Sequence, residues 1–315
     1  MGLAAVVYSG SALLADQRGK SPVKVFILAG QSNMQGQGVT GIREEFHNAK
    51  GTLVSMLADP AKAPLIKHLK DVNGEWVERK DVWVYDINEF GTRKGNLDFG
   101  FGWNLGDKTW FGPELQFGHV VKSQIPNQVL IIKTAWGGRA LYTDFRPPSS
   151  GGAVGPFYQE MIQTVKRVLG DLKQEFPDYD GGGYELAGFV WWHGWNDFCD
   201  PSQAVPEYEQ NLVNLIKDVR KDLNAPGLPV IVGEFTGPWG ADCKEPAAIA
   251  VRKAQANAAA RPEFRGNVNF VETHDYVRTE QESPTGEGYH EFKNGETYFL
   301  IGDAFGKTML KMLKK

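Results

Sequence analysis

The sequence predicts an α/β fold with a mainly parallel sheet. Short apolar runs alternate with helical patterns along the chain, which is typical of βαβ units. Most of these runs are nearly continuous in apolar residues, as expected of strands that are buried on both faces. We therefore expect a central sheet that is covered by helices.

Six runs are candidate strands, and helical spacing marks the segments between them. The strands are expected at residues 23–30, 81–87, 128–136, 186–194, 228–235 and 267–273. The spacing of one helical face is kept by Leu212, Leu215, Ile216, Val219 and Leu223. Further helices are expected at residues 157–176, 246–260 and about 298–313.

The chain is expected to form one domain over residues 21–315, because no internal repeat or linker divides it. Residues 38–112 are longer than a βα crossover needs and predict an insertion with one strand inside. The loop at 142–156 is rich in Pro, Gly and Ser and follows the third strand. Ligands of open parallel sheets bind at the carboxyl ends of the strands, so this loop is expected to shape a cleft.

Residues 1–20 are interpreted as a leader or the remnant of a signal peptide. They are small and apolar up to Asp16 and then polar, which is similar to the end of a secretory signal with cleavage near Ala15. A disordered or strand-like leader is the alternative. Export predicts a secreted or periplasmic protein, in which Cys199 and Cys243 could pair; two unlinked buried thiols are the other possibility.

The charge balance excludes some classes of partner. The 315 residues carry 34 basic and 38 acidic side chains, a formal net charge of −4, which argues against a polyanionic partner. No cluster of Lys and Arg suggests binding to nucleic acid. No run of about 18 apolar residues exists, so no membrane span is expected. The sequence leaves the oligomeric state open.

A serine follows the first strand, in Gly30-Gln31-Ser32-Asn33-Met34. Glycines around it allow the backbone of other segments to approach closely. Ser32 could be a nucleophile exposed at the edge of the sheet, or it could cap the next helix. The residues alone leave both readings open.

Glycines and aromatic residues follow two further strands. Trp136-Gly137-Gly138-Arg139 comes after the third strand, and its glycines could turn backbone N–H groups toward a developing oxyanion or form a plain tight turn. Trp192-His193-Gly194-Trp195-Asn196-Asp197 comes after the fourth. So many polar and aromatic groups at a strand end are hard to explain by core packing alone.

Glu287 and His290 lie three residues apart, just before the last predicted helix. A serine nucleophile needs a base, and the base needs a carboxylate that orients it. The order Ser32, Glu287, His290 can supply such a triad. The other histidines compete for this role, and they are His47, His68, His119, His193 and His274.

Together these motifs carry a resemblance to a known family. "GQSNM", "WGG", "WWHGWND" and the "ExxH" block resemble the SGNH-hydrolase superfamily, and within it the carbohydrate-esterase branch of sialic-acid-specific acetylesterases and acetylxylan-esterase-like proteins. The similarity extends over nearly the whole chain from about residue 22. It implies a three-layer α/β/α, flavodoxin-like fold with five or six strands. It also implies ester hydrolysis through an acyl-enzyme, with no cofactor and no metal.

The resemblance implies roles for individual residues. Ser32 matches the nucleophile, and its own N–H would be one oxyanion donor. Gly138 is the expected second donor, with Gly137 as the alternative. His290 matches the catalytic histidine. Glu287 stands where the family usually has an aspartate, and Asp275 is the rival carboxylate.

The block after the fourth strand departs from the family pattern. The family commonly reads Trp-x-Gln-Gly-Glu, in which the glutamine donates to the oxyanion. Here His193 occupies the position of that glutamine and Trp195 that of the glutamate. A neutral imidazole can donate one hydrogen bond, so His193 is the expected third donor. Asn196 and Asp197 could compensate or only brace the loop.

Substrate contacts are expected from polar and aromatic residues at the strand ends. The candidates are Gln31, Asn33, Trp136, Arg139, Trp195 and Asp197. Tryptophans gather there, and at least two are expected to be buried; they are Trp136, Trp191, Trp192, Trp195 and Trp239. Hydrogen bonds to sugar hydroxyls or to a sugar carboxylate could come from Arg139, Asp144 and Arg146, which could equally form a surface ion pair.

The expected function is removal of O-acetyl groups from carbohydrate, with acetylated xylan or a similar polysaccharide preferred and O-acetyl sialic acid second. The main alternative is a carbohydrate-binding protein that kept the fold but lost efficient catalysis. A nucleotide-binding flavodoxin-like domain is disfavoured because no G-x-G-x-x-G or Walker-type loop follows the first strand. A metal hydrolase is disfavoured because no two histidines have ligand spacing on one element.

Overall fold

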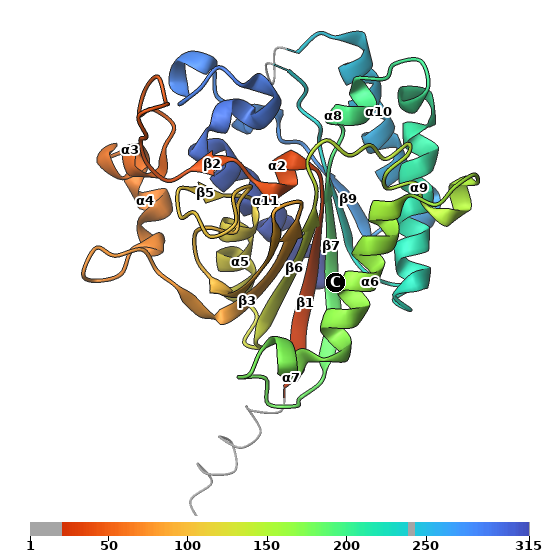
Figure 1. Ribbon diagram of the computed structural model, residues 1–315, viewed down its shortest axis with the longest axis horizontal. Helices are drawn as coiled ribbons and strands as arrows, with labels where there is room; N and C mark the ends of the chain where they lie inside the picture. The colour runs from red at the N-terminus through yellow and green to blue at the C-terminus, as the bar shows by residue number, and fades with distance from the viewer. Residues whose placement is uncertain (1–20, 239–242, 315) are drawn as a thin grey trace, which may run out of the picture.

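The computed structural model describes residues 21–238 and 243–314, so the predicted leader at 1–20 and Trp239 lie outside the described residues. Seven strands form one sheet in the order β4-β3-β6-β1-β7-β8-β9 (Figure 1). They are β1 (Val23–Gly30), β3 (Arg79–Asn88), β4 (Gly91–Leu97), β6 (Val129–Ala135), β7 (Tyr184–Trp192), β8 (Val230–Gly233) and β9 (Val268–Val271). All neighbouring pairs are parallel except β3 and β4.

Helices cover both faces of the sheet, which confirms the α/β/α fold (Figure 1). The helices of eight or more residues are α5 (Glu114–Lys122), α6 (Pro156–Gly170), α9 (Ala204–Asp222), α10 (Pro246–Ala259) and α11 (Gly295–Leu313). The shorter elements are α2 (Ser32–Gln35), β2 (Gly38–Val39), α3 (Leu53–Ala58), α4 (Ala63–Ile66), β5 (Trp110–Phe111), α7 (Leu172–Glu175) and α8 (Trp195–Phe198).

Alternation along β1 explains the two layers of core. Ile27 points to the face covered by α6, α9 and α10, where it joins the cluster that contains Val165 and Leu212. Phe26 points to the opposite face, covered by α5 and α11, and joins the cluster that contains Phe117. Because successive side chains of a strand point to opposite faces, a nearly continuous apolar run such as β1 fills both cores.

The sheet has one more strand than the six that the apolar runs predicted. The additional strand is β4, "GTRKGNL", which pairs antiparallel with β3 at the edge of the sheet. Only Leu97 of β4 is buried, so the strand has no apolar run that sequence analysis could detect. The segment 38–112 therefore holds β2, β3, β4 and β5, not one strand.

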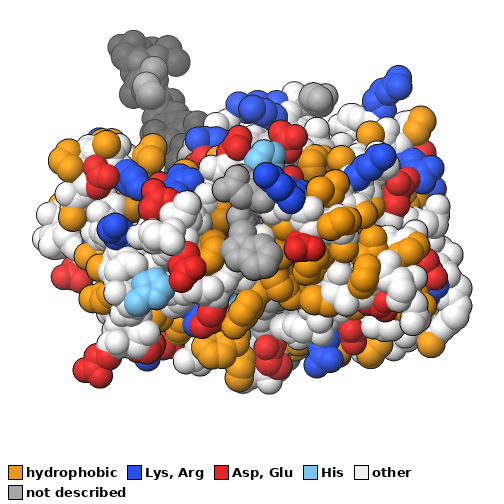
Figure 2. All heavy atoms as spheres, turned by 90° about the horizontal axis from the view of Figure 1, so that it is seen from above, with side chains coloured by type: hydrophobic (Ala, Val, Ile, Leu, Met, Phe, Trp, Pro, Cys, Tyr) orange, Lys and Arg blue, Asp and Glu red, His pale blue; other side chains and the backbone are white. Residues whose placement is uncertain are grey.

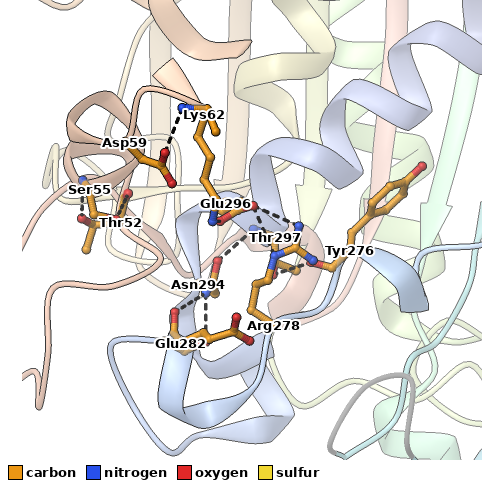
Figure 3. Close-up of polar contacts among 12 residues, drawn as sticks. Thr52, Ser55, Asp59, Lys62, Tyr276, Arg278, Glu282, Asn294, Glu296 and Thr297 are labelled. Atoms are coloured by element: carbon orange, nitrogen blue, oxygen red, sulfur yellow. Dashed lines mark hydrogen bonds and ion pairs between the residues drawn. The ribbon is translucent and has the colours of Figure 1, made fainter. Parts of the chain in front are cut away.

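The segment around α3 and α4 is tied to the start of α11 by a buried carboxylate (Figure 3). Glu296, 6% exposed at its side chain, pairs with Lys62 at 2.6 Å and with Arg278 at 3.0 Å. Asn294 caps α11 by accepting from the Thr297 N–H at 3.0 Å. These contacts hold the chain that follows His290 against the body of the protein.

Both cysteines are free thiols: Cys199 is exposed and Cys243 is buried. The pairing considered from the sequence is therefore not formed. Among residues 21–238 and 243–314, no helix is long and apolar enough to span a bilayer.

Candidate active site

The ends of three neighbouring strands bring the sequence motifs together. Gly30 at the end of β1 is level with Ala135 of β6 and with Trp192 of β7. The Trp136 N–H donates to the Gly30 carbonyl at 3.2 Å. The residues after these strands therefore lie side by side at the carboxyl edge of the sheet, which Figure 2 views from above.

Ser32 is the first residue of α2, and the cap position belongs to Gln31. No side chain caps this helix, so the interpretation of Ser32 as a helix cap is wrong. Its hydroxyl is half-buried and bonds to no other described residue. A glycine is required at position 30, two residues before Ser32, since its φ is +157° and a Cβ there would lie 2.1 Å from the Trp192 carbonyl oxygen.

The two glycines after β6 differ in what their N–H groups contact. Gly137 N–H points to the Glu89 carboxylate at 3.4 Å. Gly138 is exposed, has a φ of +68°, and donates its N–H to no other described residue. The backbone N–H of Ser32 is also uncommitted within the described chain. Of the two glycines, Gly138 is therefore the one with a donor available.

His290 lies between Gln37 and Glu287. Its Nε2 is 3.2 Å from Gln37 Nε2, and its Nδ1 is 3.5 Å from a Glu287 carboxylate oxygen. An amide nitrogen donates, so Nε2 carries the lone pair and Nδ1 carries the proton that faces Glu287. Burial lowers the pKa of His290, which keeps the ring neutral. This is the tautomer that a general base needs, although Nε2 is turned toward Gln37 in this state.

Glu287, not the rival Asp275, is the carboxylate beside His290. The pKa of Glu287 is lowered to about 2, first by its contact with His290 and then by Lys293, which lies 2.7 Å away. Asp275 is 86% exposed at its side chain and lies 3.5 Å from His274. Asp275 therefore lies beside His274 and not beside His290.

Glu291, the residue after His290, is a buried carboxyl that ties the His290 segment to α2. Its Oε1 accepts from Thr236 Oγ1 at 2.5 Å and from Asn33 Nδ2 at 3.4 Å, and its Oε2 has no partner among the described residues. Tyr298 donates to Asn33 Oδ1 at 3.0 Å. Burial raises the pKa of Glu291 to about 8.

The backbone at this point is strained, since Glu291, Phe292 and Lys293 have φ values of 50°, 55° and 56°. Three consecutive left-handed residues other than glycine are costly and persist only when their surroundings hold them. The contacts of Glu291 are part of what holds them.

Replacing Glu291 with glutamine should flatten the alkaline side of the stability profile. The folded-state pKa of about 8 lies above the ordinary 4.5, so the contribution of this group is complete below about pH 4.5 and is lost as pH rises through about 8. Between about pH 5 and 8.5 the free energy of unfolding should fall for the wild type relative to the variant, by on the order of 3–5 kcal/mol. Urea unfolding at both pH values measures this difference.

Glu287→Gln is the matched control for that experiment. The pKa of Glu287 is lowered to about 2, so its contribution is lost only as pH falls through that value and is constant on the alkaline side. Asp86 and Asp197, whose pKa values are raised to about 7, stay in both proteins and cancel in the difference. Parallel profiles for wild type and Glu291→Gln would contradict the assignment of a neutral carboxyl.

The expectation that His193 donates into the oxyanion hole is not met by its geometry. Its side chain is fully buried, and Nε2 lies 2.8 Å from the Arg139 carbonyl oxygen, which can only accept. Its other nitrogen lies 3.2 Å from the Tyr208 hydroxyl. Burial lowers the pKa of His193 to about 4, so the ring is neutral and has a single N–H. That N–H donates a hydrogen bond to the Arg139 carbonyl oxygen. His193 thus anchors the segment that follows Gly138.

Most of the predicted substrate contacts are structural instead. Asp197 is fully buried and accepts from the N–H groups of Leu141 at 2.7 Å and Tyr142 at 2.9 Å, so it braces the loop after Gly138. Gln31 is 2% exposed and bonds to Asn196 at 3.2 Å.

Of the four remaining residues predicted to contact substrate, two are buried and two are partly exposed. Asn33 is buried between Tyr298 and Glu291. Trp136 is 5% exposed and packs on Phe157, and Trp191 and Trp192 are buried too, which confirms that at least two tryptophans belong to the core. Arg139 and Trp195 stay partly exposed, with Arg139 3.8 Å from Asp144.

A cavity of about 430 Å³ opens beside His290, and it is lined by Trp195, Phe198, Pro238, Glu245, Gly286, Gly288 and Tyr289. A larger cavity, of about 650 Å³, includes Val23 and Gln128 at the amino-terminal ends of β1 and β6, on the opposite edge of the sheet from Ser32. Within residues 21–238 and 243–314, no three or more His, Cys, Asp or Glu side chains are grouped so as to hold a metal ion.

Sequence reasoning missed Glu291 and Gln37, which contact the predicted site. Glu291 adjoins His290 in the sequence, but no local pattern indicates that its carboxyl is buried.

Lys133 was missed as well, although the sequence carries a signal for it: it is a single charge inside the apolar run "VLIIKTA". It is fully buried and donates to the carbonyl of Gln35, the last residue of α2, at 2.6 Å.

Comparisons with known proteins agree on one family and fold. Residues 22–292 match the sequence model of a family described as carbohydrate esterase, sialic acid-specific acetylesterase. A probable carbohydrate esterase of Arabidopsis thaliana is 27% identical over 211 residues, which cover 67% of this chain and 68% of that protein.

Two solved structures share the fold. A protein from Arabidopsis thaliana superimposes with a TM-score of 0.58 and 18% identity, over 92% of this chain and 98% of that one. The structure of NanS superimposes with a TM-score of 0.57 and 15% identity, over 93% of this chain and 99% of that one.

Proposed function

The chain belongs to the carbohydrate esterase family of sialic acid-specific acetylesterases and is a carboxylic ester hydrolase, and we propose that it removes O-acetyl groups from carbohydrate through an acetyl-enzyme on Ser32. The observation that carries this proposal is the half-buried Ser32 at the carboxyl edge of the sheet, whose hydroxyl bonds to no other described residue and whose helix also contacts the His290 segment.

In the first half of the reaction, Ser32 Oγ attacks the acetyl carbonyl carbon while His290 Nε2 takes the Ser32 proton. This requires Nε2 to turn from Gln37 toward Ser32 when substrate binds; catalytic hydrogen bonds are often long before substrate is present. The N–H groups of Ser32 and Gly138 hold the oxyanion. His290 then protonates the sugar oxygen, the bond between the acetyl carbon and that oxygen breaks, the sugar leaves with a free hydroxyl, and acetyl-Ser32 remains.

In the second half, His290 takes a proton from water, which attacks the carbonyl carbon of acetyl-Ser32. The bond between that carbon and Ser32 Oγ then breaks, His290 returns the proton to Ser32 Oγ, and acetate is released. Glu287 stays ionised because its pKa is about 2, so it stabilises the imidazolium that forms at each transfer. His193 and Asp197 contribute by bracing the loop that carries Gly138, through Arg139, Leu141 and Tyr142. Secretion stays a prediction, because it rests on residues 1–20.

Acetate release from a panel of substrates tests the proposal. Wild type and Ser32→Ala are compared on acetylated xylan and on O-acetyl sialic acid, and wild type alone is expected to release acetate. Equal release by both proteins would contradict an acetyl-enzyme on Ser32. Glycan binding without any acetate release would favour a carbohydrate-binding protein.

A further inference from the structure

The cavity of about 430 Å³ lies beside His290 and is connected to the Ser32 segment through Trp195, and its described lining includes neither Ser32 nor His290. Its Tyr289 ring lies 4.5 Å from the ring of His290, measured between centroids. Its Trp195 begins α8, whose Asn196 is hydrogen-bonded to Gln31, the neighbour of Ser32. The cavity is therefore a candidate site for the part of a substrate that adjoins the ester bond.

The walls of the cavity suit a pyranose ring. Trp195 and Tyr289 approach at 5.8 Å with an angle of 58° between their planes, so they form two tilted walls, and Phe198 packs on Trp195 at 5.5 Å. Tyr289 is 44% exposed, although large apolar rings are normally covered. The C–H faces of a sugar pack against such rings, and the volume falls in the range of about 300–1,000 Å³ typical of small-molecule sites. Figure 2 shows hydrophobic side chains gathered across this face.

The described lining of the cavity carries a negative charge. Glu245, an exposed carboxylate, is the one charged side chain among the described lining residues. Glu287 lies next to the lining residues Gly286 and Gly288, and the nearby cation Lys293 is engaged by it at 2.7 Å. No lysine or arginine belongs to the described lining. An anionic sugar would be repelled by the carboxylates here and would find no basic partner among the described lining residues. A neutral sugar would not be repelled.

We propose that the cavity lined by Trp195 and Tyr289 binds the ring of a neutral acetylated sugar, and that its negative charge disfavours an anionic sugar such as sialic acid. This inference rests on the proposed function for the ester bond. It names the substrate class of the same site, and it predicts a preference that differs from the sialic acid in the description of the family.

Binding to the Ser32→Ala variant tests the inference apart from catalysis. Calorimetric titration with xylo-oligosaccharide and with sialic acid should show tighter binding of the neutral ligand by about tenfold. Glu245→Lys in the same background should move the ratio of the two affinities toward sialic acid by about tenfold. Glu263→Lys changes the net charge equally but lies just before β9, at the opposite edge of the sheet, and should leave the ratio unchanged.

Hydrolysis gives the second readout. Tyr289→Ala should lower the ratio of kcat/KM for acetylated xylo-oligosaccharide to kcat/KM for 4-nitrophenyl acetate by about tenfold, mainly through KM. Tighter binding of sialic acid, or an equal effect of Glu245→Lys and Glu263→Lys, would overturn the inference. Absence of acetate release with the predicted binding preference intact would overturn the proposed function and leave the cavity assignment standing.

Discussion

Replacing Ser32 with alanine should lower kcat for acetate release by on the order of 10⁴ to 10⁶, and adding His290→Ala should lower it no further. The two side chains are expected to act as one unit, because the imidazole has no proton to take once the hydroxyl is gone. Rates of release by both single variants and the double variant measure this. If the two side chains contributed independently, the rate loss of the double variant would be the product of the two single losses.

The fold should survive the Ser32 substitution, which makes the loss of rate interpretable. The Ser32 hydroxyl bonds to no other described residue, so no buried partner is left unpaired. The free energy of unfolding should therefore change by less than about 1 kcal/mol. A double variant that is much slower than either single variant would contradict the acyl-enzyme scheme, since the His290 ring would then contribute without Ser32.

Replacing Lys133 with methionine should lower the free energy of unfolding by about 3–5 kcal/mol. Its ammonium group lies 2.8 Å from Glu114 and 3.2 Å from Asp86, and all three side chains are fully buried. Burial raises the pKa of both carboxyls, that of Asp86 to about 7. Without the lysine, the two carboxyls lose the ammonium group that pairs with both of them, and the Gln35 carbonyl loses a donor.

Urea unfolding at neutral pH measures the loss, as a lower midpoint with an unchanged slope. Lys307→Met is the matched control, because Lys307 is 64% exposed and its pair with Asp303 should contribute less than about 1 kcal/mol. Adding Asp86→Asn and Glu114→Gln to Lys133→Met should restore part of the stability, since neutral side chains need no cation. Equal effects of Lys133→Met and Lys307→Met would contradict a role for the buried cluster.

The effect of Lys133 should reach catalysis as well. Lys133 donates to the carbonyl at the end of α2, and Ser32 opens the same helix. We expect lower kcat in Lys133→Met even where the protein is fully folded, because the helix that positions the nucleophile has lost an anchor.

Six of the seven strands of the sheet were predictable because each of the six leaves a local pattern. The run at 23–30 coincides with β1, and those at 81–87 and 128–136 match β3 and β6 to within two residues. The signal comes from burial on both faces, which demands apolar side chains one after another. β4 has only one buried residue and no such demand, so its sequence reads as a polar loop.

The directions of polar side chains were not predictable, because their partners are distant in sequence. Asp197 is 56 residues from Leu141, and His193 is 54 from Arg139. Both residues follow β7 at the expected edge, but they point into the protein, toward the loop after β6. The sequence therefore determined which segments meet at the edge of the sheet, through periodic burial and turn residues. Only the tertiary structure decided which of their polar groups stay available at that edge. The packing of neighbouring loops satisfies some of them internally and leaves others, such as the Ser32 hydroxyl and the Gly138 N–H, without a partner among the described residues.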